Sequence, residues 1–199
     1  MIETMRIRFS QIFSTLMLVL LLVSNSAWET KTPLLSSLFF VFGVILVGIA
    51  SLGRLWCSLY IAGYKTEKLV IEGPYSICRN PLYFFSFLGA LGVGFASETL
   101  LIPSMILVAF AMYYPNVIKS EEVNLNELHG SEFEMYQAKV PCFFPKLSCL
   151  MEPQKYLVNP VVFKKHIFSA LWFVWFVGIL ELIEELHELK IIPTIFNIY

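Results

Sequence analysis

The feature that most constrains the fold of this chain is a set of long stretches without a charged residue. Residues 34–53 and 99–118 are each uncharged over twenty positions. At 1.5 Å per residue, each run makes a helix of about 30 Å, which is enough to cross the hydrocarbon core of a bilayer. The chain is 57% hydrophobic and 15% charged, whereas soluble domains average roughly 45–50% and 25%. We therefore expect an all-α protein whose solvent is the bilayer.

Three further apolar runs complete the predicted transmembrane bundle. Residues 9–28 are uncharged, residues 82–97 form a run of sixteen, and residues 167–180 form a run of fourteen. The first run also has the composition of a signal peptide, but the spans that follow it favour a retained helix. The last run is short for a crossing, so the C-terminal region 164–199 holds either a fifth membrane helix or an interfacial helix, followed by an acidic tail. We predict one domain, residues 1–199, with four to five membrane helices.

Charges and prolines between the runs predict where the helices begin and end. Arg54 is expected to end the second helix, and residues 55–71 then form an interfacial segment anchored by Tyr and Trp side chains. The apolar runs on either side of Glu98 are expected to form a helical hairpin that turns at this residue. Pro103 then falls in the first turn of the returning helix, where proline is well tolerated.

Glycines mark places where the predicted helices approach a neighbour. The second run carries Gly43 and Gly48, and the run before Glu98 carries Gly89, Gly92 and Gly94. Small residues let membrane helices come close together. We expect Gly43 and Gly48 to serve helix packing, whereas the other three lie close to a neighbouring helix or to a ligand.

Two polar stretches stand out from this apolar background. Residues 72–83, EGPYSICRNPLY, contain two prolines and a glycine, which disfavour regular structure and predict an ordered loop. Loops of this kind often bind ligands. Residues 121–139 are amphipathic and are interrupted by Gly130, which predicts one or two short helices on the membrane surface covering the loop. Residues 140–146 then form an extended, proline-bounded segment.

The distribution of charge predicts the orientation in the membrane, and the sequence gives no sign of a nucleic acid or metal partner. Twelve of the 14 Lys and Arg residues lie in the N-terminal tail, between Arg54 and Arg79, or between Lys119 and Lys165. The positive-inside rule therefore puts the N-terminus and both polar stretches in the cytoplasm, and the protein in the inner or plasma membrane. The net charge is −1 with no long basic run, so we expect no nucleic acid partner. The Cys and His spacings match no metal site, so we expect reduced thiols and no metal.

The order and spacing of residues in the two polar stretches match a known pattern over residues 69–146. The matching residues are Gly73, Pro74, Tyr75, Arg79, Asn80, Pro81, Tyr83, Glu121, Glu122, Gly130, Tyr136, Pro141 and Pro145. This set resembles the signature of the integral-membrane methyltransferases typified by isoprenylcysteine carboxyl methyltransferase, a family that includes the phospholipid methyltransferases.

The resemblance implies an S-adenosylmethionine-dependent methyltransferase, with a cofactor pocket built by the loop, the hairpin ends and the amphipathic cover. It implies that Glu122 binds the cofactor's ammonium group and that Glu121 stands near the reacting centre as the catalytic candidate. A carboxylate beside a sulfonium-bearing ligand forms charge-assisted interactions, and positioning with electrostatics supplies most of such catalysis. The other residues implied to bind the cofactor are Gly73, Pro74, Tyr75, Arg79, Asn80, Pro81 and Tyr83.

Two positions depart from the family pattern. The common loop His is Asn80 here, which forms hydrogen bonds but does not titrate near neutral pH. Members that methylate a prenylcysteine carboxylate have an Arg where this chain has Val117. The resemblance therefore implies the cofactor more strongly than the substrate. We expect methyl transfer to a lipophilic acceptor from the bilayer, with a lipidic carboxylate favoured; the alternatives are a phospholipid amine and a non-catalytic membrane scaffold.

Overall fold

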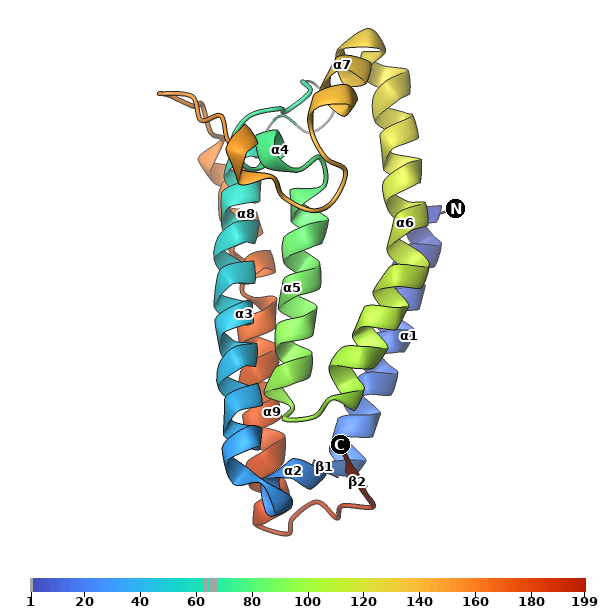
Figure 1. The fold of residues 1–199 in the computed structure, drawn as a ribbon, viewed down its shortest axis with the longest axis vertical. Coiled ribbons are helices and arrows are strands. Elements are labelled where there is room, and N and C mark those ends of the chain that lie inside the picture. Colours follow the sequence, from blue (N-terminus) through green and yellow to red (C-terminus); the bar gives the residue numbers. More distant parts are fainter. Residues whose placement is uncertain (1, 63, 65–67) are drawn as a thin grey trace.

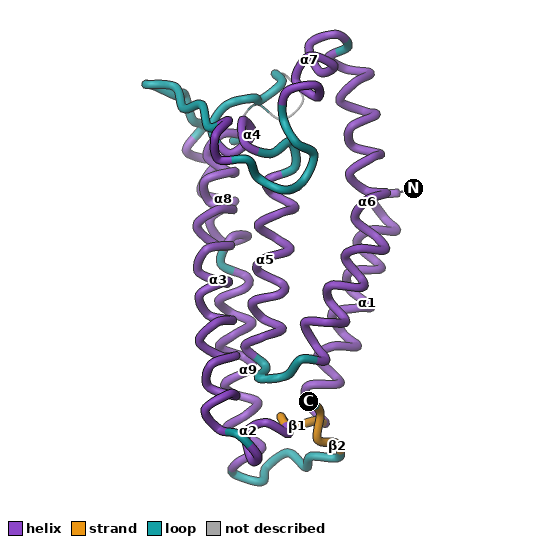
Figure 2. Tube along the Cα trace, viewed as in Figure 1, coloured by secondary structure: helices purple, strands orange, loops and turns teal. Residues whose placement is uncertain are grey.

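The computed structural model describes residues 2–62, 64 and 68–199 as a bundle of long helices (Figure 1). The predicted all-α bundle is confirmed, because strand structure in the described residues is limited to one short parallel pair (Figure 2). The elements in chain order are α1 (Ile2–Val23), β1 (Ser24–Ser26), α2 (Ala27–Lys31), α3 (Pro33–Ile61), α4 (Pro74–Ile77), α5 (Pro81–Ala96), α6 (Leu101–His129), α7 (Ser131–Lys139), the 3-10 helix η1 (Leu147–Cys149), α8 (Pro160–Ala170), α9 (Trp172–Glu188) and β2 (Phe196–Ile198).

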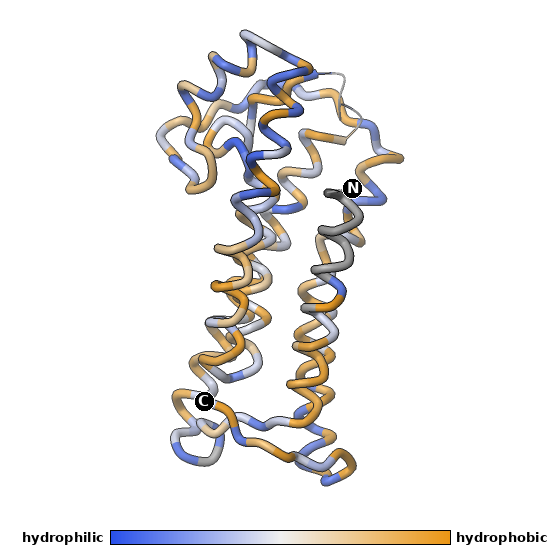
Figure 3. The backbone as a smooth tube through the Cα atoms, turned by 90° about the vertical axis from the view of Figure 1, so that its right-hand side faces the viewer, coloured by the Kyte–Doolittle hydropathy of each residue, from blue (hydrophilic) through white to orange (hydrophobic). Residues whose placement is uncertain are grey.

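Several of these helices have the length and hydropathy of membrane spans. Hydrophobic residues dominate the long shafts, while hydrophilic residues gather at the two ends of the bundle (Figure 3). The final candidate combines α8 and α9, so the C-terminal run has the length that a crossing requires. In the described chain, the segments long and apolar enough to cross are Pro33–Ile61, Leu101–His129 and Pro160–Glu188, and the shorter apolar helical stretches are Ser14–Val23 and Pro81–Ala96.

Helix α3 does not end where its first charge predicts. Arg54 lies inside the helix, which continues to Ile61. The guanidinium group is accommodated within the bundle, where it donates to the Oγ of Ser86 on α5 and, at 3.0 Å, to the Oγ of Ser169 on α8. The expectation that Arg54 ends the span is therefore wrong, because hydrogen bonds from other helices satisfy the charge that the sequence places there.

The segment around the end of α3 also differs from the predicted interfacial anchor. Tyr60 is buried, its ring lies 4.6 Å from that of Tyr156, and its carbonyl oxygen accepts a hydrogen bond of 2.7 Å from the Tyr156 hydroxyl. Tyr60 thus packs inside the protein. Lys65 and Glu67, which we expected in this interfacial segment, lie outside the described residues.

Close approach of α3 and α5 forms the centre of the bundle. A Cβ atom added to Gly43 would lie 2.5 Å from the carbonyl oxygen of Gly92, so these helices touch through their backbones. This confirms the packing role of Gly43, but a Cβ on Gly48 would meet nothing within 4 Å, so that expectation is wrong. The glycines of α5 each face another helix, with Gly89 against α9, Gly92 against α3 and Gly94 against α6.

Helices α5 and α6 form the predicted hairpin. The turn contains Glu98 at a positive φ of 57°, and Pro103 lies in the first turn of α6. Beyond the apolar run, however, α6 continues to Gly130, whose φ of 51° ends it. Glu121 and Glu122 therefore lie inside a long helix. The expectation that a separate surface helix begins at Glu121 is wrong. Only the segment after Gly130 forms a separate short helix, α7.

Candidate functional site

One end of the bundle brings the two polar stretches together. The loop before α5, the C-terminal part of α6, α7 and the segment after it all lie at the top of Figure 1. Backbone hydrogen bonds join the loop to the extended segment, from the N–H of Arg79 to the carbonyl of Pro141 at 2.9 Å and from the N–H of Lys146 to the carbonyl of Ile77 at 2.9 Å. The hairpin produces this meeting, because α6 returns to the end at which α5 begins.

Arg79 ties these segments together through four hydrogen bonds. Its Nε donates to Oε1 of Glu122 at 2.8 Å and its Nη2 to Oε2 at 3.3 Å. Its Nη1 donates to the carbonyl oxygens of Gln137 at 3.0 Å and Val140 at 2.7 Å. Although burial opposes the charge, the hydrogen bond and negative charge of Glu122 raise the pKa of Arg79. With side chains only 11% and 15% exposed, the two residues form a shielded bidentate pair.

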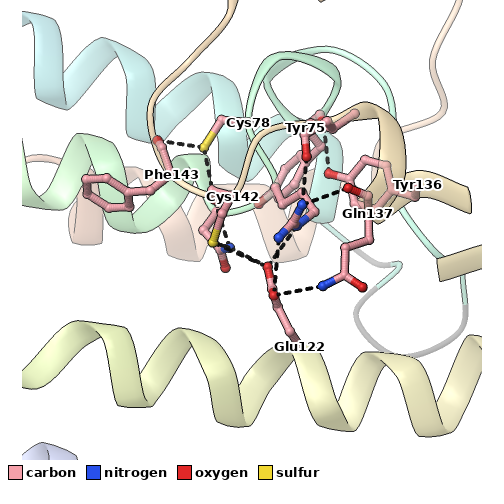
Figure 4. A network of polar contacts seen from close by, with 10 residues as sticks. Tyr75, Cys78, Glu122, Tyr136, Gln137, Cys142 and Phe143 are labelled. Carbon is pink, nitrogen blue, oxygen red and sulfur yellow. Dashed lines mark hydrogen bonds and ion pairs between the residues drawn. The ribbon is translucent and has the colours of Figure 1, made fainter. Parts of the chain in front are cut away.

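The Glu122 carboxylate accepts further donors from three segments (Figure 4). Asn80 Nδ2 lies 3.3 Å and Cys142 Sγ 3.5 Å from Oε1. Gln137 Nε2 lies 3.4 Å from Oε2. The closest contact of Oε1 is therefore the 2.8 Å bond from Arg79, whereas both contacts of Oε2 exceed 3.2 Å. The carboxylate has a fixed orientation, and Oε2 is its less tightly bound oxygen.

Glu121 has a different setting from its neighbour. It is exposed, and its Oε2 accepts a hydrogen bond of 2.7 Å from the Tyr83 hydroxyl. The Tyr83 ring lies 5.5 Å from the Tyr114 ring, which stacks on Phe110 at 3.8 Å. Tyr83 thus connects the acidic pair to the aromatic residues that continue down α6 into the bundle.

The remaining loop candidates shape the backbone. Gly73 has a φ of 59°, and a Cβ there would lie 2.3 Å from an aromatic ring of α3, so only glycine fits. Pro74 and Pro81 occupy the first positions of α4 and α5. The carbonyl oxygen of Tyr75 accepts a hydrogen bond of 2.6 Å from the Tyr136 hydroxyl. These residues hold the loop in place for the polar side chains of its second half.

Sequence reasoning missed the cysteines and the glutamine of this network. Cys78 Sγ lies 3.0 Å from the carbonyl oxygen of Phe143, and burial raises its pKa to about 12. Burial and the charge of Glu122 raise the pKa of Cys142. Both thiols therefore stay protonated at neutral pH and act as hydrogen-bond donors. No spacing in the sequence indicates these contacts, because they depend on how the chain turns back after Gly130.

A cavity of about 420 Å³ lies deeper in the bundle, lined by α1, α3, α5, α6, α8 and α9. Most of its lining residues are apolar. Tyr114 belongs to this lining and also contacts Tyr83, so the cavity adjoins the residues around Glu121. Its polar or charged lining residues on α3, α5, α6 and α8 are Arg54, Ser86, Tyr113, Tyr114 and Ser169.

In the part of the chain that the structure describes, no group of three or more His, Cys, Asp or Glu side chains is arranged to hold a metal ion.

Comparisons with known proteins identify the family. The phospholipid methyltransferase family matches residues 32–132, which include the 72–83 loop and the first part of the second polar stretch, with Glu121 and Glu122. The nickel-cobalt-cadmium resistance protein NccN of Alcaligenes xylosoxydans is 36% identical over 169 residues, covering 85% of this chain and 78% of that protein. The cobalt-zinc-cadmium resistance protein CzcN of Cupriavidus metallidurans is 38% identical over 169 residues, covering 85% and 77%. No solved structure matches. The chain therefore belongs to the phospholipid methyltransferase family of membrane methyltransferases.

Proposed function

We propose that this protein transfers a methyl group from S-adenosylmethionine to a lipophilic acceptor in the membrane. The observation that carries the proposal is the meeting of loop and acidic pair, with Arg79 bound to Glu122 at 2.8 Å and Tyr83 bound to Glu121 at 2.7 Å. These partners are 43 and 38 positions apart in the chain. Membership of a methyltransferase family supports the same reaction.

The polar groups of this site suit a zwitterionic ligand that carries a sulfonium. S-adenosylmethionine, when bound, supplies a methyl group activated by the positive charge on its sulfur. Glu122 would hold the ammonium group through Oε2, whose contacts with Arg79 and Gln137 are long, at 3.3 and 3.4 Å. The loop containing Arg79 and Asn80 would hold the methionine carboxylate and the ribose through hydrogen bonds. Gly73, Pro74, Tyr75 and Pro81 contribute by fixing the shape of that loop.

Glu121 and Tyr83 are proposed to stand at the reacting centre. Glu121 is the more exposed member of the acidic pair, and the Tyr83 hydroxyl fixes its orientation. Its negative charge favours a cationic group beside it, and its free lone pairs accept a proton from an acceptor that releases one. Methyl transfer needs alignment above all, and residues held by several hydrogen bonds provide it.

The acceptor is proposed to enter from the bilayer. The cavity beside Tyr83 is mostly apolar, which suits a lipid chain. O-methylation of a lipidic carboxylate is the favoured reaction, although Val117, where related carboxylate methyltransferases have Arg, is buried and uncharged. Methylation of a phospholipid amine is the second candidate, because the family is named for phospholipid methyltransferases.

We propose that the site faces the cytoplasm, because eleven of the 14 Lys and Arg residues, not counting Arg54 inside α3, belong to sequence segments expected on this side of the membrane. S-adenosylmethionine is then available from the cytosol. The two relatives are named for resistance to nickel, cobalt, zinc and cadmium. We propose that the methylated membrane product of this chain contributes to such resistance.

The proposal is tested by calorimetric measurement of S-adenosylmethionine binding to the purified full chain in lipid nanodiscs. We expect wild-type protein to bind and Glu122→Ala to bind at least about tenfold more weakly, because one charge-assisted contact is worth roughly 1.4 kcal/mol or more. Glu127→Ala, at an exposed position of the same helix, serves as the control and should bind like wild type. Folded wild-type protein that binds no S-adenosylmethionine would favour a non-catalytic scaffold.

A further inference from the structure

Arg54 is a charged residue in the interior of a membrane helix. It precedes the end of α3 by seven residues, which places it about 10 Å from that end. Besides the Oγ of Ser86, its partners are the Oγ of Ser169 at 3.0 Å and the carbonyl oxygen of Ser169 at 3.2 Å. Its Nε is buried and has no hydrogen-bond partner. Among the residues whose side chains the structure describes, no carboxylate lies within ion-pair distance of this guanidinium group.

An arginine without a counter-ion is costly at this depth. Ionisable residues inside membrane proteins are rare, usually pair with an opposite charge or line a pathway, and mark functional sites. Three hydrogen bonds to serine oxygens use only part of the donor capacity of a guanidinium group, which has five N–H groups. The side chain is therefore equipped to bind one more acceptor, and a negatively charged acceptor would balance its charge.

The cavity beside Arg54 has a polar end and an apolar end. Arg54, Ser86 and Ser169 lie in the part of the bundle nearer the acidic pair. The lining residues toward the other end of the bundle are Leu21, Val93, Ile102, Ile179 and Leu180. This polarity matches a molecule with a charged head and a hydrocarbon chain. The volume of about 420 Å³ falls within the roughly 300–1,000 Å³ typical of small-molecule sites.

We infer that this cavity binds an anionic amphiphile, with a carboxylate or phosphate head on Arg54 and its chain between α1, α5, α6 and α9. Arginine binds both heads through paired, charge-assisted hydrogen bonds. The inference rests on the proposed function, for which it specifies the class of acceptor. Ser86 follows Tyr83 by three residues on α5, so the head would lie about one helical turn below the Tyr83 contact with Glu121.

Photo-crosslinking tests the inference directly. The full chain in phosphatidylcholine nanodiscs is incubated with 18-carbon probes that carry a diazirine in the chain and differ only in the head, which is a carboxylate, phosphate, alcohol or amine. We expect the carboxylate and phosphate probes to label peptides of the cavity lining at least tenfold more than the alcohol and amine probes. Oleate should compete, whereas acetate and inorganic phosphate should not. Equal labelling by the alcohol probe, or competition by acetate or inorganic phosphate as effective as that by oleate, would overturn the inference.

Variants separate this inference from the proposed methyl transfer. Arg54→Gln should lower labelling by the anionic probes at least tenfold while keeping S-adenosylmethionine binding, and Lys119→Gln, at an exposed position of α6, should change neither. Undiminished labelling of Arg54→Gln would contradict the inference. Ala109→Phe fills the cavity without changing the charge and should also lower labelling. This variant keeps the inference testable if Arg54→Gln does not fold. Unchanged labelling of Ala109→Phe would also contradict the inference. Wild-type protein that is labelled as expected but binds no S-adenosylmethionine would refute the methyltransferase proposal and leave the amphiphile site standing.

Discussion

At the scale of single residues, Arg79 connects three segments of the site through its side chain. Its side chain holds α6 through Glu122, α7 through Gln137 and the extended segment through Val140. The lysine ammonium group has a single nitrogen, so it cannot form the bidentate pair with Glu122 and also donate to the other two segments. Arg79 therefore acts first by assembling the site.

We expect Arg79→Lys to destabilise the protein by about 3 kcal/mol, since breaking a buried ion pair typically costs 3–5 kcal/mol and lysine retains the charge. S-adenosylmethionine affinity should fall at least about tenfold, in line with a loss of roughly 1.4 kcal/mol. Denaturant unfolding and calorimetry measure the two effects. Lys139→Gln, at an exposed position of the same end, is the control; an Arg79→Lys variant as stable as this control would contradict the assembling role.

The Cys78 thiol predicts a dependence of stability on alkaline pH. Burial raises its pKa to about 12, whereas an unfolded cysteine titrates near roughly 8.5. The folded state holds the proton more tightly, so this contribution to stability is complete below the unfolded pKa and is lost as pH rises toward the folded pKa. Between pH of about 9 and 11, the melting temperature of wild type should fall more steeply than that of Cys78→Ser, whose hydroxyl does not ionise. Parallel curves would count against a buried, hydrogen-bonded thiol.

The convergence of the loop and the acidic pair was predictable, but the contacts between individual side chains were not. The resemblance to the methyltransferase signature led us to expect that the loop with Arg79 and Tyr83 meets Glu121 and Glu122, and the structure brings these residues into contact. Their roles toward a cofactor remain predictions. The contacts of Cys142 with Glu122 depend on the turn after α7, and nothing in the local sequence specifies that turn.

At the scale of elements, the contact between α3 and α5 should limit the stability of the bundle. Gly43→Ala puts a methyl group 2.4 Å from the backbone nitrogen of Ala96, so the helices must move apart. We expect a loss of about 1–3 kcal/mol, as for other overpacked interiors. Gly48→Ala on the same helix meets nothing within 4 Å and gains the same helix propensity. The free energies of unfolding of the two variants are measured in mixed micelles. Equal values would show that the stability of the bundle does not depend on this contact.

The existence of the helices was easier to predict than their ends. The length of an apolar run is set by the thickness of the bilayer. The helix itself can continue beyond that run until a residue such as glycine ends it. α3 therefore passes Arg54, whose charge is satisfied by serines of other helices, and α6 passes Glu121 until Gly130 ends it. The short pairing of β1 with β2 was missed because its strands lie near opposite ends of the chain and carry no pattern of their own.

At the scale of the whole molecule, the bundle separates two tasks along its length. Polar residues at one end form a site suited to a charged cofactor, and the interior cavity suits a lipophilic molecule that approaches from the membrane. Tyr83 lies between the two, in contact with Glu121 and with Tyr114 of the cavity wall. The distribution of charge along the sequence predicts which end faces the cytoplasm, and this orientation stays a prediction. The cavity was not predictable, since several helices contribute to it and each is apolar by itself.

The most direct test of this account is methyl transfer from radiolabelled S-adenosylmethionine by the protein in native-lipid nanodiscs, followed by extraction with organic solvent. We predict label in the lipid fraction, and a loss of about 100-fold or more in Glu121→Gln, a scale typical for removal of one electrostatic group at a reacting centre. Glu127→Gln should retain the wild-type rate. Label only in water-soluble products, or equal transfer by Glu121→Gln and wild type, would contradict the central claim that the loop and the acidic pair form a methyltransferase site for a membrane acceptor.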